Sequence, residues 1–325
     1  MILYAGIAMR TTLVCAAVLS LCIGVSAAAF ASATHPALAS ASVVIASGTN
    51  ASRATIPVSI DGLRTTCVLD TGTSAIIVSP WIAESARLGA HAGTFEVAPD
   101  GRTYVDRQTE ISRFGVASFT LRDVPALISP NVSGGTALCG YDFFAHFPTL
   151  IDRARNEVTL FPAASKLARL HCISVDLAPR VPLATIEIND TWVREIVLDS
   201  GMAGGGALWE GLRSQLRRPL VANQEYETMP AAIHQGFACG AIASIRYASG
   251  SPLSDMPICT EPQRPDGYNG IIETNLPTVH AMAVDYAHRR ICFDVDGYSS
   301  VASPRNQVTA PGDAWSRFNA LRPPR

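Results

Sequence analysis

The sequence is poor in charge, and above all in lysine. Charged residues make up 16% of the 325 positions, Lys166 is the only lysine, and the formal net charge is −2. No basic run is present, which argues against a nucleic-acid partner. Hydrophobic residues make up 48% of the chain, which is ample for a packed core, and the length suggests about two domains.

Several chemical signatures are missing as well. The chain has no GxSxG motif of a serine hydrolase, and no CxxC or Cys/His spacing that suits zinc. The glycine-rich segment Gly201–Gly206 lacks both GKS/T and GxGxxG, which disfavours a phosphate-binding loop. The histidines are scattered without metal-ligand spacing. We therefore expect neither a metal nor another cofactor.

The N-terminus has the pattern of a targeting segment. Arg10 precedes an apolar, Ala-rich run that ends at Ala31–Ala33, a small-x-small cleavage pattern, and Met9 is an alternative start. We expect a signal peptide over residues 1–33, hence a periplasmic or secreted protein without stable membrane association after cleavage. The run approaches membrane-spanning length, so an uncleaved, membrane-anchored form is the alternative.

Six cysteines remain after such a cleavage, an even number that is typical of disulfide-bonded exported proteins. The sequence alone does not choose among the pairings that six cysteines allow. We expect pairs within each half of the chain, with free buried thiols in some pairs as the alternative. The expected pairs are Cys67 with Cys139, Cys239 with Cys259, and Cys172 with Cys292.

One short motif occurs twice. Val68–Gly72 reads VLDTG and Val197–Gly201 reads VLDSG, so each copy runs from a short apolar strand into Asp, a hydroxyl residue and Gly. A single Asp-Ser/Thr-Gly is good turn chemistry. Two copies in similar surroundings instead suggest a pair of carboxylates, Asp70 and Asp199, that meet across a symmetric cleft.

The repetition extends beyond the motif. A strand, a tight turn and a second strand precede each copy. Further along, Leu138–Gly140 matches Ile271–Glu273, and Asp152 matches Asp285, which we interpret as structural turn residues. The landmarks keep one order and an offset of about 130 residues, which indicates a diverged duplication.

Short strands rich in Val, Ile and Thr dominate both halves. We expect an all-β, bilobal protein in which each lobe is a partly closed barrel with few short helices, and a cleft lies between the lobes. Helix-like stretches follow the motifs at Trp81–Leu88 and Leu208–Leu216. The expected segments are a Ser/Ala-rich leader (34–50), an N-terminal lobe (51–163), a linker (164–169), a C-terminal lobe (170–297) and a flexible tail (298–325).

These residues resemble the pepsin-like and retropepsin-like aspartic peptidases, in particular bacterial exported proteins with two retropepsin-like domains in one chain. The N-terminal lobe matches better, through DTGTS at Asp70–Ser74 and the apolar-apolar-Gly element Leu138–Gly140. The resemblance implies an aspartic endopeptidase that acts on peptides or proteins, with Asp70 and Asp199 as its catalytic dyad. One chain carries both aspartates, so we expect a monomer.

The resemblance also implies supporting roles around the dyad. Gly72 and Gly201 would let the backbone turn tightly where a side chain would obstruct it. Thr71 and Ser200 would interlock the two motif loops through hydroxyl-to-backbone hydrogen bonds. Tyr104 lies in the region of a flap and would close over the substrate.

The C-terminal lobe departs from the family pattern at two points. Met202 stands where the N-terminal lobe has Thr73, whose hydroxyl would support the dyad carboxylate. Glu273 stands where the N-terminal lobe has Gly140, unless the register is shifted and Gly270 takes that place. These departures keep two alternatives open, a non-catalytic peptide- or partner-binding module on the same fold, and an unrelated all-β exported protein with fortuitous motifs.

Overall fold

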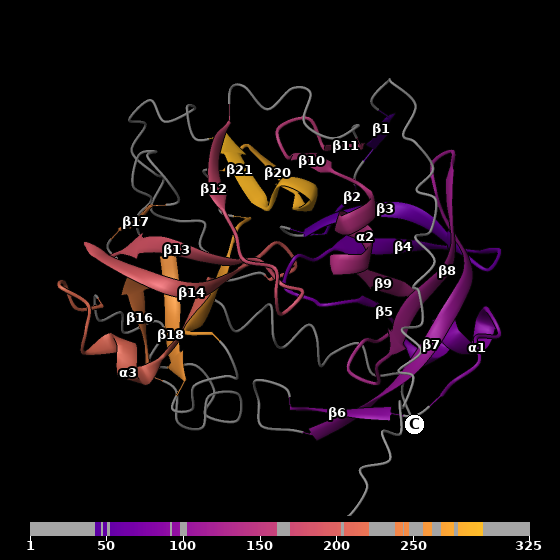
Figure 1. Cartoon of the computed structure of the whole chain (residues 1–325), viewed down its shortest axis with the longest axis horizontal. Helices are drawn as coiled ribbons and strands as arrows, with labels where there is room; N and C mark the ends of the chain where they lie inside the picture. Colours follow the sequence, from indigo (N-terminus) through magenta and orange to yellow (C-terminus); the bar gives the residue numbers. More distant parts are fainter. Residues whose placement is uncertain are drawn as a thin grey trace, which may run out of the picture. The chain divides into compact units, whose positions relative to one another are not determined.

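A computed structural model of the chain describes residues 43–46, 48–50, 53–91, 93–97, 103–160, 170–202, 205–220, 238–242, 244–246, 256–261, 268–275 and 279–294 (Figure 1). The expected signal peptide, linker and tail lie outside these residues. Within the described ranges, no helix has the length and apolar character needed to cross a membrane. Strands dominate, which confirms the expected all-β class.

An eight-stranded sheet, the N-terminal sheet, has the order β2-β3-β4-β9-β5-β8-β7-β6. The long strand β7 also pairs with β3, which partly closes the sheet into a barrel. The strands are β2 (Gly48–Asn50), β3 (Arg53–Ile60), β4 (Leu63–Leu69), β5 (Ile76–Val78), β6 (Gly93–Val97), β7 (Thr103–Val116), β8 (Phe119–Ile128) and β9 (Thr136–Cys139).

A seven-stranded sheet, the C-terminal sheet, repeats the central pairings of the first. Strands β14 and β19 are parallel, as are β4 and β9, and β15 is antiparallel to β19, as β5 is to β9. Its order is β16-β18-β15-β19-β14-β13-β17. The strands are β13 (Leu183–Ile188), β14 (Thr191–Asp199), β15 (Gly206–Trp209), β16 (Ala238–Ile242), β17 (Ile245–Arg246), β18 (Met256–Glu261) and β19 (Gly270–Glu273).

A third, six-stranded sheet takes three strands from each half of the chain, and we call it the shared sheet. Its order is β1-β11-β10-β20-β21-β12, with β10 and β20 antiparallel at the centre. Strands β1 and β2 both precede residue 51, the expected start of the N-terminal lobe, and pair with β11 and β3. The strands are β1 (Val43–Ala46), β10 (Thr149–Asp152), β11 (Glu157–Leu160), β12 (His171–Ser174), β20 (Ala281–Asp285) and β21 (Arg290–Asp294).

The helices among the described residues are short: α1 (Pro80–Ser85), α2 (Tyr141–His146), α3 (Glu210–Arg213) and a 3-10 turn, η1 (Tyr286–His288). Helix α1 begins where the sequence provides a cap, because the Ser79 hydroxyl accepts a hydrogen bond from the Ile82 N–H (3.1 Å) and Pro80 suits the first turn. The second expected helix was placed too early. Leu208 is buried and pairs with both β18 and β19, so burial within the sheet decides its conformation.

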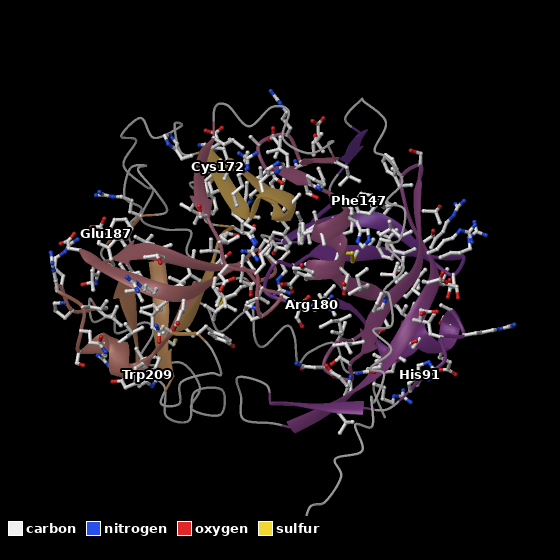
Figure 2. The ribbon with its side chains drawn as sticks, in the orientation of Figure 1. His91, Phe147, Cys172, Arg180, Glu187 and Trp209 are labelled. Atoms are coloured by element: carbon white, nitrogen blue, oxygen red, sulfur yellow. A yellow bond between two sulfur atoms is a disulfide. The ribbon has the colours of Figure 1, made fainter. Side chains whose placement is uncertain are left out.

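The core follows from alternation along the strands and from a cluster of aromatic rings. In β3, Ile56, Val58 and Ile60 are buried, with less buried residues between them. Helix α2 adds Phe143 and Phe144, whose rings meet edge to face at 5.4 Å, and Phe147 follows directly after it (Figure 2). These fully buried rings belong to the hydrophobic core, and β9 leads directly into the helix that carries two of them.

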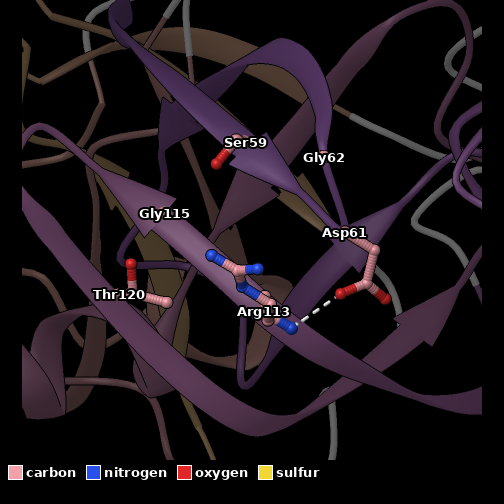
Figure 3. Close-up of a pocket in the computed structure, with 6 residues that line it drawn as sticks. All are labelled: Ser59, Asp61, Gly62, Arg113, Gly115 and Thr120. Atoms are coloured by element: carbon pink, nitrogen blue, oxygen red, sulfur yellow. Dashed lines mark hydrogen bonds between the residues drawn. The ribbon is translucent and has the colours of Figure 1, made fainter.

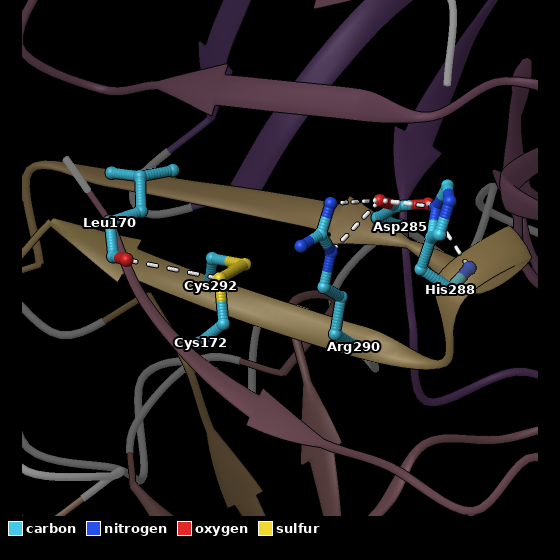
Figure 4. A network of polar contacts seen from close by, with 6 residues as sticks. All are labelled: Leu170, Cys172, Asp285, His288, Arg290 and Cys292. Atoms are coloured by element: carbon cyan, nitrogen blue, oxygen red, sulfur yellow. Dashed lines mark hydrogen bonds and ion pairs between the residues drawn. A yellow bond between two sulfur atoms is a disulfide. The ribbon is translucent and has the colours of Figure 1, made fainter. Parts of the chain in front are cut away.

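Two of the expected disulfides are confirmed. Cys67 and Cys139 join β4 to β9, and both residues are fully buried. Cys172 and Cys292 join β12 to β21 in the shared sheet (Figure 4).

The third expected pair stays a prediction. Cys259 is disulfide-bonded, and the register of β16 and β18 puts it opposite Cys239. The side chain of Cys239 lies outside what the structure describes.

We expect the Cys67–Cys139 disulfide to stabilise the N-terminal sheet, because it closes a loop with a sequence separation of 72. Replacing both cysteines by Ala should lower the free energy of unfolding by about 4 kcal/mol. Urea denaturation of the variant and the oxidised wild type checks this. An unchanged midpoint at unchanged slope would contradict it.

Candidate active site

The two repeated motifs lie at equivalent places in the two sheets. Asp70 directly follows β4, and Asp199 is the last residue of β14. Each aspartate stays attached to the neighbouring parallel strand, since the Asp70 N–H donates to the Cys139 carbonyl (3.0 Å) and the Thr274 N–H donates to the Asp199 carbonyl (2.9 Å). Both side chains are buried, with 8% of each residue exposed. The sheets therefore fix both carboxyl groups within the protein interior.

Four hydrogen bonds interlock the two motif loops. The Thr71 hydroxyl donates to the Leu198 carbonyl (2.7 Å) and accepts from the Ser200 N–H (2.9 Å). The Ser200 hydroxyl reciprocates, donating to the Leu69 carbonyl (2.8 Å) and accepting from the Thr71 N–H (3.0 Å). All four bonds are buried, and the pattern is symmetric between the two halves. The geometry is the one expected for these two hydroxyl residues.

This interlock brings the two aspartate side chains together. The carboxyl groups of Asp70 and Asp199 hydrogen-bond to each other. A methyl group at Gly72 would lie 2.5 Å from the Asp199 carboxyl group, and one at Gly201 would overlap the Asp70 carboxyl group. Glycine is therefore required in both loops by the close approach of the opposite carboxyl group.

The backbone supports the two carboxyl groups unequally. Asp70 Oδ1 accepts a hydrogen bond from the Gly72 N–H (2.9 Å), whereas Asp199 Oδ1 accepts from both the Gly201 N–H (2.6 Å) and the Met202 N–H (3.0 Å). The Thr73 hydroxyl donates to the Ala75 carbonyl (2.9 Å). The hydroxyl expected to support the dyad thus supports its own loop, and Met202 contributes through its backbone.

Burial raises the pKa of both aspartates. For Asp70 the pKa lies well above its usual range, because burial is reinforced by the negative charge of Asp199. The pKa of Asp199 is raised by burial, while hydrogen bonds from Gly201, Asp70 and Met202 act in the opposite direction. These shifts favour one proton shared by the pair, and the two backbone N–H donors to Asp199 favour its ionised form.

Two residues near the pair were not anticipated from the sequence. The positive charge of Arg53 lowers the pKa of both aspartates. Thr55 of β3 pairs with Val68 of β4, and continuing that register puts Arg53 opposite Asp70. Counting residues back from the turn of the expected hairpin would therefore have identified Arg53 from the sequence. Tyr286 is buried in η1, and the pKa of its phenol is raised by burial and by both aspartates.

The tyrosine also belongs to a stacked aromatic group. Its ring stacks on Tyr141 with 5.6 Å between centroids, and Arg180 lies over Tyr141 while forming an ion pair with Asp142 (Figure 2). The Tyr286 hydroxyl has no hydrogen-bond partner within the described part of the protein. Nothing in the sequence pattern marked this residue.

Tyr104, the expected flap residue, lies in β7 opposite Glu96 of β6. The two strands are antiparallel neighbours. The side chain of Tyr104 lies outside what the structure describes, so its contact with a substrate stays a prediction.

Other polar sites lie apart from the dyad. Asp285 is fully buried, and its carboxylate accepts hydrogen bonds from the Arg290 guanidinium (2.9 and 3.0 Å) and lies 2.9 Å from His288 Nδ1. It also caps η1 by accepting a hydrogen bond from the His288 backbone N–H (3.3 Å), so its role is structural (Figure 4). A hollow of about 320 Å³ is lined by residues of the β3–β4 turn, β7 and β8 (Figure 3).

Across the described ranges, no group of His, Cys, Asp and Glu has the arrangement of a metal site.

Residues 56–146 match the family model of the gag-polyprotein putative aspartyl protease. The protein has the fold of the retropepsin-like and pepsin-like aspartic proteases. The family match covers less than a third of the chain and includes the Asp70 motif, β9 and α2. The comparison with curated proteins gives no match.

Two solved structures are similar at low sequence identity. Basic 7S globulin from soybean is 9% identical with a TM-score of 0.45, over 78% of this chain and 94% of that chain. A retropepsin-like aspartic protease from Rickettsia conorii is 13% identical with a TM-score of 0.28, over 37% of this chain and 89% of that chain.

The interlock predicts a large stability effect for Thr71→Val. The change removes the hydroxyl while keeping the shape, and so leaves the buried Ser200 N–H and Leu198 carbonyl without a partner. We expect a loss of about 2–4 kcal/mol in the free energy of unfolding, measured by chemical denaturation. Thr120→Val, on an exposed position of β8, is the matched control and should change it by less than about 0.5 kcal/mol. Equal effects at both positions would refute the interlock.

The raised pKa of Asp70 predicts a pH-dependent gain for Asp70→Asn. The folded protein holds this proton to higher pH than the unfolded chain, so wild-type stability falls as pH rises from about 4 through the folded-state pKa. Asn has no proton to lose, so the variant should be more stable at neutral pH, with a difference that shrinks towards pH 4. Thermal unfolding across pH measures this, with exposed Asp123→Asn as the control.

Proposed function

We propose that this protein is an aspartic endopeptidase that hydrolyses peptide bonds with water activated by Asp70 and Asp199. The observation that carries the proposal is a pair of buried carboxyl groups that hydrogen-bond to each other across two interlocked motif loops. The family match over residues 56–146 supports a protease-type function in general.

The chemistry follows from the unequal protonation of the pair. Hydrolysis of an amide needs a base that takes a proton from water and an acid that stabilises the carbonyl oxygen as charge develops on it. Asp199, ionised and bound by two backbone N–H groups, suits the base, and protonated Asp70 suits the acid. The proton taken from water then passes to the leaving amine as the C–N bond breaks. Neither a covalent intermediate nor a metal is needed.

The surroundings tune the pair in opposite directions. Burial favours the protonated forms, whereas the positive charge of Arg53 favours ionisation. Activity requires one proton on the pair, so it should fall both when the pair is doubly protonated and when it is doubly ionised. We therefore expect a bell-shaped pH profile with its optimum on the acid side of neutrality.

We also propose a cellular location and an oligomeric state for the enzyme. The two disulfides are compatible with a periplasmic or secreted location, and we propose export by the N-terminal segment. One chain supplies both aspartates, so the proposed enzyme works as a monomer on peptide or protein substrates.

The decisive experiment is cleavage of denatured casein by the purified protein between about pH 3 and pH 7, with and without pepstatin. Asp70→Asn and Asp199→Asn should each lower kcat/KM by about a thousandfold, because each removes the acid or the base. Exposed Asp123→Asn should retain wild-type activity.

Retained cleavage in either dyad variant would refute the proposed mechanism. If the folded wild type cleaves nothing across this range, the binding-module alternative replaces it, and capture of peptides by the inactive protein becomes the next measurement.

A further inference from the structure

Glu273 occupies the position that Gly140 holds in the N-terminal half. Leu69 pairs with Cys139 in the parallel strands β4 and β9, and Leu198 pairs with Ile272 in β14 and β19. The next residue along each partner strand is therefore Gly140 in one half and Glu273 in the other. This register rules out the alternative in which Gly270 takes the place of the glycine.

The N-terminal half has no room for a side chain at this position. A methyl group at Gly140 would lie 2.5 Å from the Ala75 carbonyl oxygen and would overlap Thr73. The corresponding loop in the C-terminal half is one residue longer, since Asp70 lies six positions before Ile76, whereas Asp199 lies seven before its counterpart Gly206. The two halves therefore differ at this position both in the side chain and in the length of the loop that faces it.

Glu273 holds this longer loop through two hydrogen bonds. Its Oε2 accepts from the Gly205 N–H (2.7 Å), and its own N–H donates to the Gly205 carbonyl (2.8 Å). In the N-terminal half only the backbone bond is possible, from the Gly140 N–H to the Ala75 carbonyl (3.2 Å). Glu273 is a buried acid, with 5% of the residue exposed, and it binds Gly205 at the C-terminal end of the Asp199 loop.

An arginine from the other half of the chain supplies the opposite charge. Arg153 follows β10, and its guanidinium donates to the Asn275 carbonyl. Burial lowers the pKa of Arg153, and the negative charge of Glu273 opposes that shift. The Asn275 side-chain amide in turn donates to the Ser200 carbonyl. Arg153 therefore connects to both ends of the Asp199 loop, through Asn275 at Ser200 and through Glu273 at Gly205.

We propose that Glu273 is a positioning residue that holds the longer, glycine-rich loop of the C-terminal half so that Asp199 faces Asp70, with Arg153 as its charge partner. A buried acid and one extra residue thus replace the tight glycine contact of the N-terminal half. The kinetic part of this inference rests on the proposed peptidase function, whereas the structural part does not.

Five variants, one of them a control, test the proposal. Glu273→Ala should lower kcat by about tenfold to a hundredfold with KM within about twofold, because a charge-assisted hydrogen bond to the loop is lost while the substrate contacts remain. Glu273→Gln keeps an acceptor without the charge and should fall between Glu273→Ala and the wild type. Exposed Glu210→Gln, in α3 of the same half, is the matched control and should match the wild type.

The remaining two variants are Glu273→Gly alone and a rescue. Glu273→Gly combined with deletion of one glycine from Gly204–Gly206 recreates the loop length and glycine of the N-terminal half. It should recover kcat to within about threefold of the wild type, whereas Glu273→Gly alone should not. Thermal unfolding confirms that each variant is folded, and a folded rescue variant no better than Glu273→Gly alone overturns the proposal.

Amide hydrogen exchange separates this inference from the proposed function. Exchange in peptides that span residues 199–206 should be at least about tenfold faster in Glu273→Ala than in the wild type, with exchange around Asp70 unchanged. If the wild type proves inactive, the proposed function fails and the exchange result alone decides the role of Glu273. Unchanged exchange in this loop would overturn the role whatever the activity.

Discussion

The structure depends on holding two carboxyl groups in contact within the protein interior. Asp70 and Asp199 repel each other when both are ionised, and burial penalises each charge, so the pair is unfavourable unless it shares a proton. The four hydrogen bonds of Thr71 and Ser200 hold the loops together against this cost. The symmetric hydrogen bonds are therefore needed to offset the electrostatic cost of bringing the two carboxyl groups together.

The sheets behind the loops supply the rigidity that such contact needs. Each motif follows a strand that lies beside a parallel partner, and in the N-terminal half a buried disulfide fixes that pair of strands together. The shared sheet then joins the two halves through β10 and β20. Because the shared sheet joins the two halves, the two motif loops are held in a fixed position relative to each other.

The two halves reach the same geometry with different chemistry. The N-terminal half uses Gly140 and a short loop, and the C-terminal half uses Glu273, a longer loop and the charge of Arg153. The fold thus accommodates Glu273, the residue at which the sequence departs from the family pattern. Arg53, a residue of the N-terminal half, adds its positive charge to the surroundings of the pair.

The sequence by itself determined the all-β class and the duplication, because strand patterns and a repeated motif are local signals. The interlocking of Thr71 with Ser200 was implied by the family resemblance, and the two disulfide pairs were one choice among those that six cysteines allow. Only the tertiary structure decided the strand at Leu208, the effect of both aspartates on the pKa of Tyr286, and the effect of the Glu273 charge on the pKa of Arg153. These depend on packing between residues far apart in the chain. Local periodicity carries no information on such contacts, because a buried charge is tolerated only where the fold brings its partner to it.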